Sequence, residues 1–277
     1  MNPVTSKKEE IINTINKVVK ANIPIIFYLP TSLSLIETFQ NTPRTAIITR
    51  DVEHSGILQG KILSDIRNTN KKSIDRNNDN ILQYMMLQGT PDDLTTIARS
   101  KYSIRTLNEV NIKTQQLLST ACSWNRECAR RTIESAFLVY GDKIDAIISN
   151  NDEMALGAID ALQKYGFNKG NKTKYISAVG VNGIDEAKAL INQGIMTGTV
   201  IEDIPAQAKG IYDIGMNLIS GNSITHNTNL KTIHNNVVKM PYYKYIVNYK
   251  NKISQYIYLI ICVYFNFYSF YFYLNEQ

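Results

Sequence analysis

Short runs of apolar residues alternate along the chain with longer segments in which apolar residues recur three and four positions apart. The short runs are typical of buried strands, and the longer segments are typical of amphipathic helices. We predict strands at residues 23–28, 45–50, 81–87, 144–149, 175–181, 196–201 and 236–242. We predict helices at residues 6–20, 55–66, 91–108, 125–138, 151–166, 184–192 and 204–221. This alternation predicts an α/β fold with a parallel sheet covered by helices on both faces.

Two helix ends carry residues with a positional preference. Pro91 is expected to open the helix 91–108, because a first turn leaves its N–H groups unbonded and proline has none. Gly166 is expected to end the helix 151–166.

Polar residues follow several of the predicted strands. GTPDD comes after strand 81–87, SNND after 144–149, VNG after 175–181 and IEDI after 196–201. In a parallel sheet, ligands bind at the edge where the carboxyl ends of the strands meet. The pattern therefore predicts a polar ligand site at this edge.

Four residues near that edge each allow two interpretations. Asn151 and Asp152 both suit a helix N-cap, which explains one of them but not necessarily both. Trp124, the only tryptophan, lies in a polar stretch, so it is either a core residue or a platform on which a sugar ring stacks. Arg99 belongs either to a surface ion pair or to the ligand site.

The composition limits the possible partners. The 277 residues are enough for one large domain or two lobes. The net charge is +6, but the basic residues form no long run, so the excess is typical of a solvated surface and we expect no nucleic-acid partner. Of the three cysteines, Cys122 and Cys128 lie six positions apart; they form no zinc pattern, and we expect no disulfide framework.

Enzymatic chemistry has little support in the sequence. It contains neither a GxxxxGK(S/T) phosphate loop nor a GxSxG motif. Asp92 and Asp93 lie at a predicted helix start, where carboxylates are favoured in any case. The histidines show no ligand spacing; they are His54, His226 and His234. We therefore expect a protein that is not an enzyme.

The two ends of the chain are unusual. The first residues are polar and charged, with no apolar segment of the kind found in a secretory signal. Residues 256–274 hold ten of the 26 aromatic residues and no charge. This segment is long enough to span a bilayer. We favour a poorly ordered apolar tail or translation of a shifted reading frame over a membrane helix, because tyrosine is typical of membrane interfaces rather than of the middle of a span.

The stretch DRNNDNILQ places oxygen-bearing side chains at alternate positions, in Asp75, Asn77 and Asp79, followed by Gln83. Such spacing is typical of a loop that wraps Ca²⁺. The twelfth position of a helix–loop–helix calcium site falls on Met86, which cannot bind the ion. Either the loop binds nothing, or a carboxylate from elsewhere completes it.

In order and spacing, these segments resemble the bacterial periplasmic galactose/glucose-binding proteins, the solute receptors of methyl-galactoside ABC importers. The resemblance covers residues 2–242 and is strongest in ANIPIIFY, EHSGILQGK, ILQYMMLQGTP, IISNNDEMALGAIDALQ and VGVNGIDEAKALI. It implies a type I periplasmic-binding-protein fold with two α/β lobes. Residues 1–51 and 203–245 would form an incomplete first lobe, inside which the chain begins. Residues 52–202 would form the second lobe, with the calcium loop, and 246–277 a hydrophobic aromatic tail.

The resemblance also assigns residues to a metal site and a sugar site. The Ca²⁺ ligands would be Asp75, Asn77, Asp79, the backbone carbonyl of Ile81, Gln83 and the remote carboxylate of Asp145, where the family carries the longer Glu. The sugar contacts would be Arg99, Trp124, Asn151 and Asn182, the last in place of an Asp. Leu29, Thr95 and Glu202 stand where the family has other polar contacts, so sugar affinity is expected to be weak.

The implied function is reversible, non-catalytic capture of D-galactose or D-glucose by a monomer in the periplasm. The complex would be presented to an ABC transporter permease, and a chemoreceptor would be a further partner. The alternative is a degenerate, truncated remnant that folds and binds calcium but no longer binds sugar.

Overall fold

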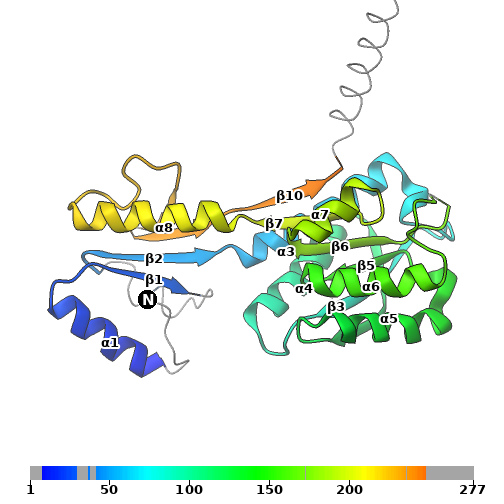
Figure 1. The fold of residues 1–277 in the computed structure, drawn as a ribbon, viewed down its shortest axis with the longest axis horizontal. Helices are drawn as coiled ribbons and strands as arrows, with labels where there is room; N and C mark the ends of the chain where they lie inside the picture. Colours follow the sequence, from blue (N-terminus) through cyan, green and yellow to red (C-terminus); the bar gives the residue numbers. More distant parts are fainter. Residues whose placement is uncertain (1–7, 30–36, 38–41, 172, 235, 248–277) are drawn as a thin grey trace, which may run out of the picture.

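The computed structural model describes residues 8–29, 37, 42–171, 173–234 and 236–247, and they form two separate sheets (Figure 1). The four-stranded sheet has the order β1-β2-β9-β8. Its strands are β1 (Ile25–Leu29), β2 (Thr45–Arg50), β9 (Val237–Met240) and β8 (Thr232–His234). β1, β2 and β9 run parallel, and β8 is antiparallel to β9.

Two helices cover the four-stranded sheet from opposite faces (Figure 1). α1 (Lys8–Lys20) packs Ile15 against Phe27 and Ile47 on one face. α8 (Ile204–Ile219) packs on the other face through residues that include Ile214 and Leu218. Glu9 and Glu10 in the first turn of α1 and lysines in its last turn complement the helix dipole.

The six-stranded sheet has the order β10-β7-β6-β5-β3-β4. Its strands are β10 (Tyr242–Ile246), β7 (Gly198–Glu202), β6 (Ser177–Asn182), β5 (Ala146–Ser149), β3 (Ile81–Gln88) and β4 (Lys113–Ala121). β10 pairs antiparallel with β7, and the other pairs are parallel.

Helices pack on both faces of this second sheet, as the alternation predicts. Leu82, Tyr84 and Met86 of β3 point into a core shared with α3 (Val52–Thr69) and α4 (Leu94–Glu109). Met85 and Leu87 point to the opposite core, because successive strand residues face opposite sides. That core is shared with α5 (Arg126–Tyr140), α6 (Asp152–Lys164) and α7 (Asp185–Asn192). Short 3₁₀ turns occur at η1 (Lys71–Ser73) and η2 (Gly141–Lys143).

The chain passes between the two sheets at three places: from β2 to α3, from β7 to α8, and from β9 to β10. At the third crossing, the predicted strand 236–242 proves to contain all of β9 and the first residue of β10. Pro241 separates them, because proline offers no N–H to a sheet. The prediction had placed residues up to 245 with the first lobe, whereas β10 lies in the sheet of the second.

Three local features of the structure differ from the prediction. β4 was not predicted, because it is an edge strand with mostly exposed, polar residues. β8 was not predicted either. Pro91 does not open α4; the helix begins at Leu94, and the Asp93 carboxylate caps it by accepting from the Thr95 N–H at 2.6 Å. By contrast, α6 ends at Lys164, two residues before Gly166, whose φ of +82° suits glycine.

Among the residues that the structure describes, no helix is both long and apolar enough to cross a membrane. The aromatic segment 256–274 lies outside the described residues, so the three interpretations of it stay open.

Candidate ligand-binding edge and metal loop

The predicted sugar contacts all belong to the second sheet or its helices, and three of them follow the carboxyl ends of parallel strands. Trp124 comes after β4, Asn151 comes after β5, and Asn182 is the last residue of β6. Arg99 lies on α4, which follows β3. The structure therefore places these side chains along one edge, although it does not gather them in one cavity.

Arg99 is not part of a surface ion pair, because its side chain is only 3% exposed. Its Nη1 donates to the Asn150 carbonyl at 2.7 Å and its Nε donates to Ser55 Oγ at 3.3 Å. Its Nη2 lies 3.9 Å from Glu202 Oε2. Burial lowers the pKa of Arg99 from its ordinary value. The guanidinium is thus fixed by protein groups on several sides.

Glu202 connects Arg99 to the first lobe. Its Oε1 lies 3.5 Å from Arg50 Nη1 and accepts a hydrogen bond from Gln207 Nε2 at 3.4 Å. Sequence reasoning noted Glu202 only as a departure from the family. It did not predict that this carboxylate would lie beside two arginines, since residues 50, 99 and 202 are far apart in the sequence.

Trp124 is half-buried and directly precedes Asn125, the N-cap of α5. Its carbonyl accepts from Asn151 Nδ2 at 3.3 Å. The indole lies directly over Gly89: a Cβ at position 89 would come within 2.1 Å of indole Cζ2, so only glycine fits beneath the ring.

Asn151 and Asp152 have different roles. Asn151 is the N-cap of α6, and its Oδ1 accepts from the Met154 N–H at 3.0 Å. Asp152 is buried, and its carboxylate accepts from the N–H groups of Gly183 and Ile184 and from the Thr199 hydroxyl. The N-cap interpretation holds for Asn151 alone, while Asp152 fixes the turn after β6.

A pocket of about 520 Å³ opens between the turn after β6 and the start of α8. Asn182 lines it together with Glu202, and its other lining residues include Gly183, Lys188 and Pro205. Asn182 is exposed, with φ at +126°. Arg99, Trp124 and Asn151 do not line this pocket.

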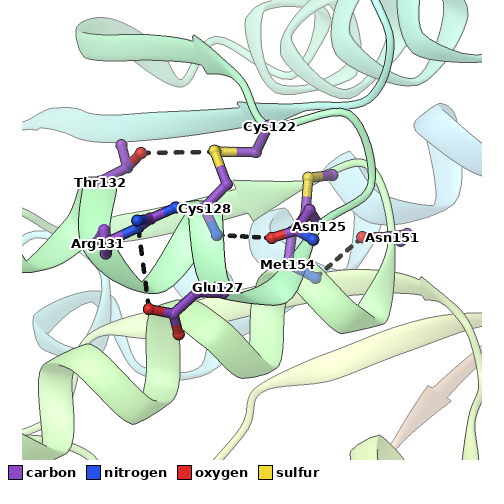
Figure 2. The surroundings of a disulfide bond; sticks show 8 residues. All are labelled: Cys122, Asn125, Glu127, Cys128, Arg131, Thr132, Asn151 and Met154. Atoms are coloured by element: carbon purple, nitrogen blue, oxygen red, sulfur yellow. Dashed lines mark hydrogen bonds and ion pairs between the residues drawn. A yellow bond between two sulfur atoms is a disulfide. The ribbon is translucent and has the colours of Figure 1, made fainter.

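Cys122 and Cys128 form a disulfide, so the prediction of no disulfide was wrong (Figure 2). Cys122 directly follows β4 and Cys128 lies in the first turn of α5, and the turn between them brings their Cα atoms to 5.4 Å. Sequence reasoning missed the pair because it missed β4. With the strand end at Ala121 recognised, the spacing would have indicated a tight turn with a cysteine at each side.

The predicted calcium loop connects η1 to β3. Asp75 is 2% exposed and Asp145 is fully buried. Asp145 Oδ1 accepts from the Arg76 N–H and Oδ2 from the Gln83 N–H, each at 2.9 Å, so this carboxylate joins both ends of the loop. Burial, together with the nearby charge of Asp75, raises the pKa of Asp145 to about 6. The Asp75 carboxylate accepts from the Asn80 N–H and lies 3.4 Å from Lys71 Nζ.

The remaining predicted ligands converge on Asp79. Its Oδ2 accepts from Asn77 Nδ2 at 2.9 Å and from Gln83 Nε2 at 2.6 Å. Its Oδ1 accepts from the Ile81 N–H, which lowers the pKa of Asp79. The loop reverses through Asn78 and Asn80, with φ values of +60° and +67°, a conformation that asparagine tolerates.

The donor chemistry of this loop suits Ca²⁺, which prefers carboxylate, amide and carbonyl oxygens. Rotation of the Asn77 and Gln83 side-chain amides by about 180° exchanges the positions of their nitrogen and oxygen atoms, so that each oxygen becomes available as a ligand. The described residues contain no group of three or more His, Cys, Asp or Glu side chains that could hold a metal ion. A Ca²⁺ ion would therefore depend on the two amides and the Ile81 carbonyl as well as on the carboxylates, and the site stays a prediction.

Comparisons with known proteins agree with this architecture. The family model described as "Periplasmic binding protein domain" matches residues 3–223. The chain is 31% identical, over 231 residues and 82% of its length, to the D-galactose/methyl-galactoside binding periplasmic protein MglB of Haemophilus influenzae. It spans 66% of the length of that relative. A xylitol-binding protein of Mycolicibacterium smegmatis is 23% identical over 39% of this chain and 29% of its own length.

Solved structures share the fold at low sequence identity. A solute-binding protein of Actinobacillus succinogenes with bound D-allose superposes with a TM-score of 0.65, at 18% identity, covering 88% of this chain and 77% of the other. A solute-binding protein of Bacillus halodurans with bound myo-inositol gives 0.64, at 22% identity, covering 88% and 72%. The predicted type I periplasmic-binding-protein fold is thereby confirmed, and the chain belongs to the periplasmic binding protein domain family.

Proposed function

We propose that this chain is the substrate-binding component of a sugar ABC importer and that its ligand is D-galactose or D-glucose. The observation that carries the proposal is the 31% identity, over 82% of the chain, to a protein named for binding D-galactose and methyl-galactoside. The relatives are named as binding proteins, so the proposed role is capture and release without chemistry. An ABC permease would receive the sugar, and a chemoreceptor would be a second partner.

The carboxyl edge of the second sheet supports a sugar site in chemical terms. Trp124 offers an aromatic face on which the C–H face of a pyranose can stack. Asn182 is exposed beside the pocket of about 520 Å³, and its amide can both donate to and accept from sugar hydroxyls. Asn151 and Arg99 would complete the contacts from the neighbouring elements.

The disulfide supports a periplasmic location. Disulfides form and persist in oxidising compartments such as the bacterial periplasm and are rare in the cytosol. The Cys122–Cys128 bond is therefore consistent with the compartment in which solute receptors of ABC importers work.

One observation favours the alternative of a folded remnant that no longer binds sugar. Glu202 places a carboxylate beside Arg99, and Arg99 already donates to Asn150 and Ser55. A sugar would have to compete with these partners, and each polar group left unpaired costs about 1–3 kcal/mol. Micromolar binding amounts to only about 8 kcal/mol in total, so we expect millimolar affinity at best.

A titration distinguishes these two functions. Galactose, glucose, allose and myo-inositol are each titrated into the full chain, with heat and Trp124 fluorescence as independent readings. Millimolar binding of galactose or glucose, with weaker binding of the others, supports the importer component. No binding of any of them, by a protein with a normal melting curve, supports the remnant. A micromolar constant would contradict the weakening assigned to Glu202.

We further propose that Ca²⁺ stabilises the second lobe, held by Asp75, Asn77, Asp79, the Ile81 carbonyl, Gln83 and Asp145. Support comes from the two buried carboxylates, Asp75 and Asp145, whose charges repel each other. A divalent cation would neutralise both and fasten the loop to the start of β5. Since the role is structural, its loss is expected to lower stability without changing the fold.

A further inference from the structure

The disulfide closes the seven-residue segment from Cys122 to Cys128 (Figure 2). Trp124 lies inside this segment. The Cys122 N–H donates to the Gln88 carbonyl at 2.8 Å, and the Asn125 N–H donates to the Cys122 carbonyl at 2.9 Å. Asn125 Oδ1 accepts from the Cys128 N–H at 2.8 Å, as the N-cap of α5. The segment is therefore a tight turn, anchored to β3 at one side and to α5 at the other.

The backbone inside this turn has an unfavourable conformation. Ser123 and Trp124 have φ values of +47° and +68°, and two successive residues with side chains rarely adopt left-handed geometry. Such a conformation persists only where the surrounding structure enforces it. The disulfide is a covalent constraint across this turn, whereas the Asn151 Nδ2 bond to the Trp124 carbonyl is a single neutral contact.

This conformation decides where the indole lies. The ring lies against Gly89, immediately after β3, at a separation that no side chain at position 89 would allow. It is half-buried, so one part of its surface remains open to a ligand. A small change in the backbone at Ser123 or Trp124 would move the ring off Gly89.

We propose that the Cys122–Cys128 disulfide is a positioning device for Trp124, and that a dithiol reductant releases the indole from Gly89. The proposal rests on the proposed sugar-binding function only in that Trp124 is the stacking platform; the movement of the ring can be tested without sugar. Ligand affinity would then depend on the redox state of this bond.

The reaction is an ordinary thiol–disulfide exchange. A thiolate of the dithiol attacks the Sγ of Cys128, which is the more exposed of the two cysteine residues, and the S–S bond breaks. Cys122 leaves as a thiolate and takes up a proton. The second thiol of the reagent then resolves the mixed disulfide, which leaves two protein thiols and one oxidised, cyclic disulfide of the reagent.

The experiment uses the full chain with Cys262→Ser, so that Cys122 and Cys128 are the only thiols. Trp124 is the sole tryptophan, and its emission maximum and acrylamide quenching are measured in the oxidised and dithiothreitol-reduced protein and in Cys122→Ser/Cys128→Ser. Intensity alone is not used, because a disulfide itself quenches indole fluorescence. Circular dichroism checks that each form is folded.

We expect a red-shifted emission maximum and stronger acrylamide quenching in the reduced protein and in the double variant. If the ring is correctly placed for only about a tenth of the time, sugar affinity falls about tenfold. Ile133→Val serves as a control, because it loosens the core under α5 while keeping the turn; its Trp124 emission should match that of the parent.

Identical emission and quenching in the oxidised and reduced proteins would overturn the proposal, even if reduction lowered the melting temperature. Should the double variant not fold, the comparison of the oxidised and reduced parent decides alone, with hydrogen exchange of residues 122–128 as the second reading. The protein could bind no sugar in either redox state and still show movement of the ring on reduction. That result would support the positioning role of the disulfide and contradict the proposed function.

Discussion

At the scale of single residues, Asp75 and Asp145 stand out because they bring two negative charges into a buried region. If Ca²⁺ binds at the proposed site, it would stabilise the folded state by about 2.7 kcal/mol when its free concentration is 100 times the dissociation constant. For a chain of this size, we expect the melting temperature to rise by about 5–10 °C. Asp75→Ala should abolish the rise. Asp145→Asn should reduce it without unfolding the lobe, because the amide keeps one acceptor for the two backbone N–H groups.

Thermal melts at several Ca²⁺ concentrations measure this effect. Asp142→Asn is the control, since the Asp142 side chain is 99% exposed near the same loop, and it should leave the rise unchanged. Mg²⁺ should have little effect, because it demands a tighter octahedral site. If millimolar Ca²⁺ leaves the melting curve of the unmodified chain unchanged, the loop is only a polar turn.

At the scale of the elements, β3 and β5 are central in the second sheet, whereas β1 lies at the edge of the first. β3 pairs with β4 and β5, while β1 pairs with β2 alone among the described strands. Hydrogen exchange at strand edges proceeds through small local openings. We therefore expect the amides of residues 81–87 and 146–149 to exchange more slowly than those of 25–28. Equal protection of the two groups would count against this ranking.

The elements also show which features the sequence makes predictable. Strand 45–50 was predicted with both ends correct because the apolar run Ala46–Ile48 is flanked by Thr45 and Thr49, β-branched residues that favour strands. β4 left no such run, because its residues form an exposed edge. β10, the strand that follows Pro241, was missed because it forms by pairing with β7, which lies about 40 residues earlier in the chain. The fold class follows from local patterns, whereas the Glu202 contacts and the sheet edges depend on tertiary neighbours. The disulfide spans only six positions and was missed together with the end of β4 that precedes it.

At the scale of the whole molecule, each of the three crossings between the sheets includes a residue with a polar side chain: Arg50, Glu202 or Tyr242. Glu202 lies beside Arg50 and Arg99, and its side chain is only 9% exposed. Glu202→Gln keeps the size but leaves the buried Arg99 without its carboxylate, and we expect a loss of about 1–3 kcal/mol of unfolding free energy. Urea denaturation measures it. In the matched control, Glu186→Gln removes an exposed ion pair with Arg126 and should cost about 0.5 kcal/mol or less. Equal losses would mean that Glu202 is only a surface charge.

The crossing at Pro241 has a consequence for how the molecule melts. β9 lies inside one sheet and β10 closes the edge of the other, and a single residue separates them. Because the link is a single residue, we expect β9 and β10 to detach from their sheets together. The lobes should therefore unfold as one cooperative unit, with a calorimetric enthalpy equal to the van't Hoff enthalpy. Two resolved heat-absorption peaks would show that the lobes melt independently.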